Sequence, residues 1–122
     1  MSFQGPNQDL TKMKAERVVV TKHLELVGDT NSTDAGAIDV DTPITYITQT
    51  GAAETRTLGV GHYEGQEKTL INTVYAADTV VTAALYGSNT TITFNAAGDA
   101  WTGIWHAGEW WTKSIANGTV IG

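Results

Sequence analysis

Hydrophobic and polar residues alternate with a period of two along most of the chain. Between residues 17 and 26, Val18, Val20, Leu24 and Leu26 fall on one face, which is typical of a β-strand with one buried side. Eight more short strands are predicted at regular spacing, at 44–50, 55–58, 68–74, 80–85, 91–95, 101–106, 110–115 and 119–121. Glycine-containing turns separate most of them, so the pattern predicts an all-β antiparallel sandwich or small barrel.

Two segments depart from this alternation. Residues 1–16 are polar and built around a Gly-Pro-Asn turn, and we expect them to form an extended N-terminal arm. Residues 28–41, with the sequence GDTNSTDAGAIDVD, are rich in turn-forming residues and predict a surface loop. The expected organisation is therefore an arm at 1–16 and a single β-domain at 17–122.

Composition supports this fold class and narrows the chemistry. The 122 residues are enough for one domain, and their 13 glycines, 2 prolines and abundant threonine favour strands and turns. The chain has no cysteine, which excludes disulfides, thiolate nucleophiles and cysteine-based metal sites. The net charge is −6, so we expect neither nucleic acid nor a membrane as a partner.

Basic residues are concentrated near the N-terminus of this acidic chain. Four of the seven bases lie within residues 1–22: Lys12, Lys14, Arg17 and Lys22. Charge alone favours the interpretation that these side chains are solvated, and the alternative is that they contact an acidic protein surface.

All four tryptophans lie in the C-terminal third, where residues 101–115 predict an aromatic hairpin turned at Ala107 and Gly108. One interpretation is that the indoles supply the core and the subunit contacts of a small β-domain. The alternative is a sugar-stacking surface that includes Trp101 and Trp110.

Few side chains suggest catalysis or metal binding. His62 and His106, with Glu64 and Glu109 near them in sequence, are candidate metal ligands, but they lack the compact spacing of known metal motifs. We interpret them as turn or surface residues, and expect no enzymatic activity, metal or cofactor.

The segment that enters the strand at 68–74 contains three glycines, Gly59, Gly61 and Gly65, which are predicted to provide turn conformations that other residues resist. Both faces of that strand are largely apolar, which suggests burial against a second sheet and a neighbouring subunit. Lys68 is then expected to pair with an acidic residue. The residues predicted to build the core or a subunit interface are Gly65, Gln66, Lys68, Leu70, Phe94, Trp101, Trp105, Trp110 and Trp111.

Several blocks in residues 44–122 together resemble small virion proteins of tailed bacteriophages. The blocks, in order, are Thr57-Leu58-Gly59, Gly61, Glu64-Gly65-Gln66-Glu67-Lys68-Thr69-Leu70-Ile71, the stretch TTITFNAAGD at 90–99, and a tryptophan-rich stretch ending in Glu109-Trp110-Trp111. The resemblance is to trimeric capsid decoration, or cement, proteins and to related β-domains of head fibres and tail fibres. It does not extend to residues 1–43.

The resemblance implies a jelly-roll-like or tulip-like β-domain that assembles as a homotrimer on the outer capsid surface of a virion, after synthesis in the host cytoplasm. Its partner would be the major capsid protein, and its role would be to stabilise the head shell. The basic arm lies outside the resemblance, and with such a partner we expect from its charge that it contacts the capsid. The alternative is a receptor- or glycan-binding domain of a head or tail fibre, with a host surface glycan as the partner.

Overall fold

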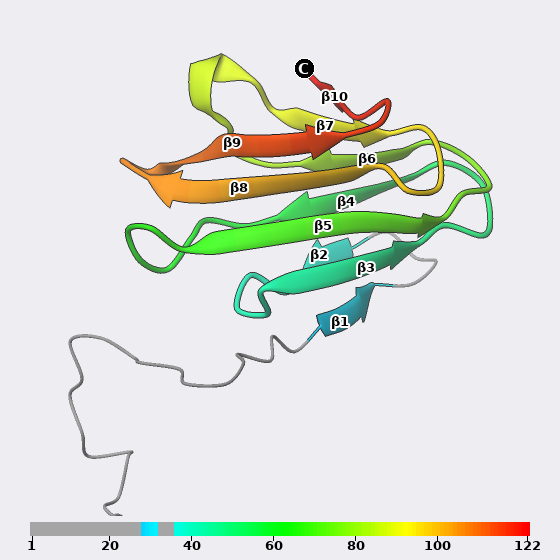
Figure 1. Cartoon of the computed structure of the whole chain (residues 1–122), viewed down its shortest axis with the longest axis horizontal. Helices are drawn as coiled ribbons and strands as arrows, with labels where there is room; N and C mark the ends of the chain where they lie inside the picture. Colours follow the sequence, from blue (N-terminus) through cyan, green and yellow to red (C-terminus); the bar gives the residue numbers. More distant parts are fainter. Residues whose placement is uncertain (1–27, 32–35) are drawn as a thin grey trace, which may run out of the picture.

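A computed structural model describes residues 28–31 and 36–122 of the chain (Figure 1). Within these residues, ten strands form two five-stranded sheets that lie face to face, and the short 3-10 helix η2 (Tyr86–Ser88) follows the sixth strand. The strands are β1 (Gly28–Asn31), β2 (Gly36–Ile38), β3 (Ile44–Thr48), β4 (Glu54–Leu58), β5 (Glu67–Val74), β6 (Thr79–Thr82), β7 (Thr91–Phe94), β8 (Ala100–His106), β9 (Glu109–Ala116) and β10 (Val120–Ile121).

The chain changes sheet at every strand from β1 to β6. Sheet A has the order β1-β3-β5-β8-β9 and sheet B the order β10-β7-β6-β4-β2. The pairs β1/β3, β3/β5, β2/β4 and β4/β6 are parallel. The first six strands therefore form a coil in which successive strands alternate between the two sheets and each of the strands β1 to β4 pairs in parallel with the strand two positions later. The last four strands then extend both sheets in antiparallel fashion.

The expected all-β fold is confirmed, and of the two predicted alternatives, a sandwich or a small barrel, the two sheets form a sandwich that does not close into a barrel. The expected antiparallel pairing is wrong, because the sheets are mixed. Alternation with a period of two is the same in parallel and antiparallel strands, so it does not specify direction. Parallel pairing needs a crossover connection, and here each crossover passes through a strand of the opposite sheet.

The eight strands predicted between residues 44 and 121 all occur, and their boundaries differ from the predicted ones by a few residues at most. The predicted surface loop at 28–41 is wrong, because it contains β1 and β2. The predicted strand at 17–26 and the arm at 1–16 lie outside the described residues. No helix in the described part of the chain is long and apolar enough to cross a membrane.

The core lies between the two sheets and receives alternate residues from both. Burial follows the strand periodicity, as in β5, where Lys68, Leu70 and Asn72 are buried while their neighbours are more exposed. The buried hydrophobic residues are Ile38, Ile47, Leu58, Leu70, Val81, Ala83, Leu85, Ile92, Phe94, Trp101 and Trp110.

Polar side chains are buried beside this apolar centre. Arg56 of β4 donates a hydrogen bond from Nη1 to Oε1 of Gln49, which directly follows β3, at 2.7 Å. Both side chains are fully buried. At the turn before β8, the buried Asp99 carboxylate accepts hydrogen bonds from the backbone N–H groups of Asn95, Ala96 and Gly118. These contacts satisfy groups whose burial without a partner would be costly.

Candidate functional site

Trp101 and Trp110 are completely buried in the core. Their rings meet edge to face with centroids 6.0 Å apart. Trp101 Nε1 donates to Thr112 Oγ1 at 2.9 Å, and Trp110 Nε1 donates to Gly59 O at 2.9 Å. A sugar-stacking surface that includes these two indoles is therefore excluded, because neither ring is accessible to a ligand.

Trp111 differs from the other tryptophans because it is among the exposed aromatic residues of the described chain. Its ring stacks on Tyr86, with centroids 3.8 Å apart and an interplanar angle of 21°. Trp105 is half-buried and packs edge to face against Trp110 at 5.2 Å.

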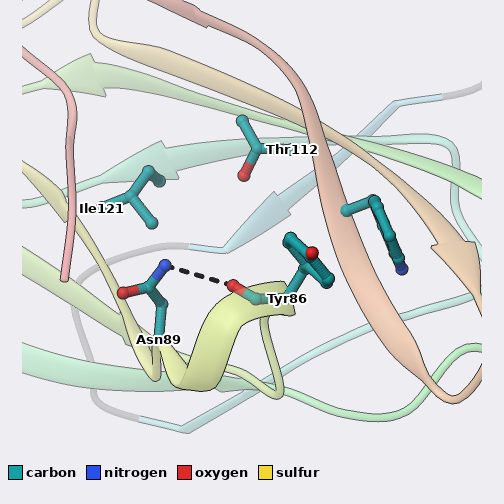
Figure 2. A pocket seen from close by; sticks show the side chains of 5 residues that line it. Tyr86, Asn89, Thr112 and Ile121 are labelled. Atoms are coloured by element: carbon teal, nitrogen blue, oxygen red, sulfur yellow. Dashed lines mark hydrogen bonds between the residues drawn. The ribbon is translucent and has the colours of Figure 1, made fainter.

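An open pocket of about 300 Å³ lies beside the stacked rings of Tyr86 and Trp111. Figure 2 shows Tyr86, Asn89, Thr112 and Ile121 around this hollow. The full lining is Tyr86, Asn89, Trp111, Thr112 and Ile121, from η2, the turn after it, β9 and β10. We call this the aromatic pocket.

Among the lining residues, only Trp111 was a candidate from the sequence. Tyr86 and Asn89 lie in the segment YGSN, where an aromatic residue within a turn-forming run is a recognisable sign of an exposed ring. Thr112 and Ile121 have no such sign, because β9 and β10 belong to different sheets and meet at the pocket only in the tertiary structure.

The two histidines considered as metal ligands each contact a different carboxylate, and of the two candidate glutamates only Glu64 is a partner in these pairs. His62 Nδ1 lies 2.6 Å from Asp41 Oδ1, and His106 Nδ1 hydrogen-bonds to Glu64 Oε2. The bond from His106 and a second bond from the Ala107 N–H lower the pKa of Glu64 below its ordinary value. Within residues 28–31 and 36–122, no three histidine, aspartate or glutamate side chains gather in a way that could hold a metal ion.

Lys68 is fully buried at the start of β5. Its ammonium donates hydrogen bonds to Asp39 O and Thr42 O, both at 2.6 Å, and to the hydroxyls of Thr42 and Thr45 at 3.0 and 2.7 Å. The neighbouring Gln66 Nε2 donates to Val40 O at 2.9 Å. Both side chains thus hold the segment between β2 and β3, part of which was expected to be a free surface loop.

The other predicted core and interface residues differ in their burial. Leu70 and Phe94 are fully buried in the core. Gly65 is exposed and has a left-handed φ of 86°, as expected for a turn glycine. Whether any of these residues contacts another subunit stays a prediction. The predicted capsid-binding residues Lys12, Lys14, Arg17 and Lys22 lie outside the described residues.

The outward face of sheet B has no charged side chain among its described residues. Strand alternation places eight residues there, five of them threonines: Ala37, Thr55, Thr57, Val80, Thr82, Thr91, Thr93 and Val120. We call this surface the threonine face. On sheet A, by contrast, Glu67 of β5 forms an ion pair with Lys113 of β9 at 2.8 Å.

No family model matches the chain, and no curated protein shows significant sequence similarity to it.

Proposed function

We propose that this protein is a structural virion protein that binds the outer surface of a bacteriophage capsid as a homotrimer and stabilises the head shell. The sequence blocks that resemble capsid decoration proteins suggest this role. The observation that carries the proposal is the threonine face, an uncharged sheet surface on a chain of net charge −6.

Charge favours the threonine face as the surface at which subunits meet. Identical acidic chains repel one another, and this repulsion is smallest where the approaching surfaces carry no charge. Threonine hydroxyls both donate and accept hydrogen bonds, so the same face can pair with its own copy. In the proposed trimer, each subunit turns its sheet B toward a common threefold axis.

The proposed mechanism relies on binding and requires no catalytic step. A protein that binds only the assembled shell stabilises that state by mass action, in proportion to its binding free energy. Three arms on one trimer bind with avidity, so each arm can contact the capsid weakly. The basic residues Lys12, Lys14 and Arg17 suit an acidic surface of the major capsid protein.

The oligomeric state is tested first, by light scattering after size-exclusion chromatography at two protein concentrations. The monomer mass is 13.0 kDa, and the proposal requires a stable species of about 39 kDa. Thr82→Lys at the threonine face should lower this mass, while Ser114→Lys on the exposed part of β9 should not. A wild-type monomer at both concentrations would overturn the trimer.

Capsid binding is tested with purified capsids that lack the protein. Deletion of residues 1–16 should leave a folded oligomer that no longer binds, and replacement of Lys12, Lys14 and Arg17 by Glu should weaken binding most at low salt. Full occupancy by the truncated protein would refute the role of the arm. A wild-type protein that does not bind such capsids would refute the decoration function itself.

A second candidate function is a glycan-binding domain of a head or tail fibre. It is favoured by a different observation, the exposed rings of Tyr86 and Trp111 beside the aromatic pocket. A glycan array probed with the full chain tests this candidate directly, and a wild-type protein that binds no glycan would exclude it.

A further inference from the structure

The aromatic pocket has the dimensions of a site for one small ring. Its volume of about 300 Å³ lies at the lower end of the range for small-molecule sites, about 300–1,000 Å³. Three segments that are separate in sequence converge on it, namely η2 with the adjoining Asn89, β9 and β10. Its lining combines two aromatic rings, one aliphatic side chain, one amide and the hydroxyls of Tyr86 and Thr112, which are the components of a site for a molecule with both apolar and polar surfaces.

The aromatic wall of the pocket is fixed in place. Trp111 Nε1 donates to His106 O at 3.0 Å, and the His106 ring packs against the indole at 5.3 Å. Tyr86 stacks on the Trp111 ring and remains 53% exposed. Because the rings are already ordered, a ligand that stacks on Tyr86 does not have to immobilise them, which lowers the entropic cost of binding.

The backbone that carries Tyr86 and Asn89 is held in an unusual conformation. Gly87 has φ 81° and Ser88 has φ 65°, a left-handed conformation that is rare for a residue with a side chain. Asn89 Nδ2 donates to Tyr86 O at 3.1 Å and closes this short turn (Figure 2). Strained residues of this kind occur preferentially at ligand sites, where the surrounding contacts maintain them.

Two polar groups on the lining retain hydrogen-bonding capacity. Thr112 Oγ1 accepts the Trp101 indole N–H at 2.9 Å, and its own hydroxyl proton can still be donated to a ligand. Asn89 uses its Nδ2 within the turn, and its Oδ1 is an acceptor. Figure 2 shows the Thr112 hydroxyl directed toward the hollow. The pocket thus offers the Thr112 hydroxyl beside an aromatic face, and the Asn89 side chain adds an amide to its lining.

The absence of charged residues from the pocket lining further restricts the class of ligand. None of the five lining residues is acidic or basic, so the pocket contains no ion partner for a phosphate, sulfate or carboxylate. The net charge of −6 adds a general repulsion against anions. A neutral polyhydroxylated ring meets both conditions, since its C–H face stacks on the negative face of an aromatic ring and its hydroxyls pair with Asn89 and Thr112.

We infer that the aromatic pocket binds one neutral pyranose ring, stacked on Tyr86 and hydrogen-bonded to Asn89 and Thr112. This inference rests on the glycan-binding candidate and is independent of the capsid-binding proposal. It specifies both the ligand class, a neutral hexose or N-acetylhexosamine unit of a glycan, and the residues that contact it.

The test is a nuclear magnetic resonance titration of the full ¹⁵N-labelled chain with glucose, galactose, mannose and N-acetylglucosamine, and with sialic acid as the anionic comparison. At least one neutral sugar should shift the Trp111 indole and Asn89 amide signals to saturation, while sialic acid should not. Tyr86→Ala should weaken this binding about tenfold or more, because it removes the stacking ring. Asn89→Ala is the second variant, which loses one hydrogen-bonding group but keeps both rings.

The matched control is Tyr63→Ala, since Tyr63 is also an exposed tyrosine, at 64%, and does not line the pocket. Saturable binding that is weakened in both pocket variants and unchanged in Tyr63→Ala supports the site. If Tyr86→Ala and Asn89→Ala both bind the sugar as strongly as the wild-type protein does, the site is overturned but the glycan-binding candidate stands. Absence of saturable binding to all four neutral sugars overturns the site, and absence of any signal on a glycan array then removes the candidate function as well.

Discussion

A Cβ atom at Gly61 would lie 2.2 Å from Cγ of Trp105, so the backbone before β5 packs directly on the indole. The sequence suggested that Gly59, Gly61 and Gly65 all provide turn conformations. Only Gly65 of these three has a left-handed φ. Gly61 is required for a different reason, because a side chain there would occupy the space of the Trp105 ring.

Gly61→Ala should therefore destabilise the fold. The added methyl group has to displace the ring of Trp105, which also packs on the buried Trp110. Overpacking of this kind costs about 1–3 kcal/mol of unfolding free energy. Urea denaturation followed by tryptophan fluorescence measures the change. Gly51→Ala is the control, because a Cβ at Gly51 meets nothing within 4 Å, and equal stability of the two variants would contradict the packing argument.

Lys68→Met tests the buried ammonium at the start of β5. Methionine fills a similar volume but leaves the carbonyls of Asp39 and Thr42 without the hydrogen bonds that Lys68 donates. We expect a loss of about 3 kcal/mol in unfolding free energy, and faster amide hydrogen exchange at Ile44 and Thr45.

Lys113→Met is the control for this substitution. Lys113 forms an ion pair with Glu67 in which both side chains are about half exposed, so its replacement should cost less than about 1 kcal/mol. A Lys68→Met protein as stable as the Lys113→Met protein would show that the ammonium does not hold the segment between β2 and β3.

Much of the fold was predictable because burial in each strand follows a period of two. In β7, Ile92 and Phe94 are buried and Thr91 and Thr93 are not, and this alternation is visible in the sequence. Similarly, Ala83 and Leu85 remain buried after β6 ends, which explains why the predicted strand continued to residue 85. The local pattern of buried and exposed residues thus identified eight strands, but it did not specify which strands pair with each other in the sheets.

The sheet topology and the aromatic pocket depend on contacts between distant residues, which no local pattern contains. Parallel and antiparallel strands share one periodicity, so the coil formed by β1 to β6 was invisible in the sequence. The pocket arises because β9 approaches the end of β6, where Leu85 and Trp110 form an isolated bridge. This bridge brings Tyr86 to Trp111, although 25 positions separate them in the chain.

Glu64 provides a test of the hydrogen bonds around His106. Its pKa is lowered by the His106 side chain and by the Ala107 N–H. A carboxylate whose pKa is lower in the folded state stabilises the fold above its unfolded pKa, and this contribution is lost as the pH falls through the folded pKa. Titration of the Glu64 carboxyl by nuclear magnetic resonance should give a pKa below that of an unfolded peptide.

His106→Ala should raise the pKa of Glu64 toward its ordinary value, because the largest cause of the shift is removed. His62→Ala is the control, since His62 pairs with Asp41 instead, and it should leave the pKa of Glu64 unchanged. A Glu64 that titrates identically in wild type and His106→Ala would mean that the two side chains do not interact in solution.

Ile38→Ala tests whether β2 belongs to the folded core, in a segment whose composition predicted a loop. Ile38 is 3% exposed and joins the core cluster from the edge strand of sheet B, where it pairs with Leu58 of β4. Truncation of a buried isoleucine leaves a cavity and should cost about 2–4 kcal/mol of unfolding free energy. Val60→Ala, at a residue that is 62% exposed, should cost less than about 0.5 kcal/mol in the same denaturation experiment. If Ile38→Ala proved as harmless as Val60→Ala, β2 would not be packed on β4, and the turn-rich composition of residues 28–41 would have indicated the correct structure.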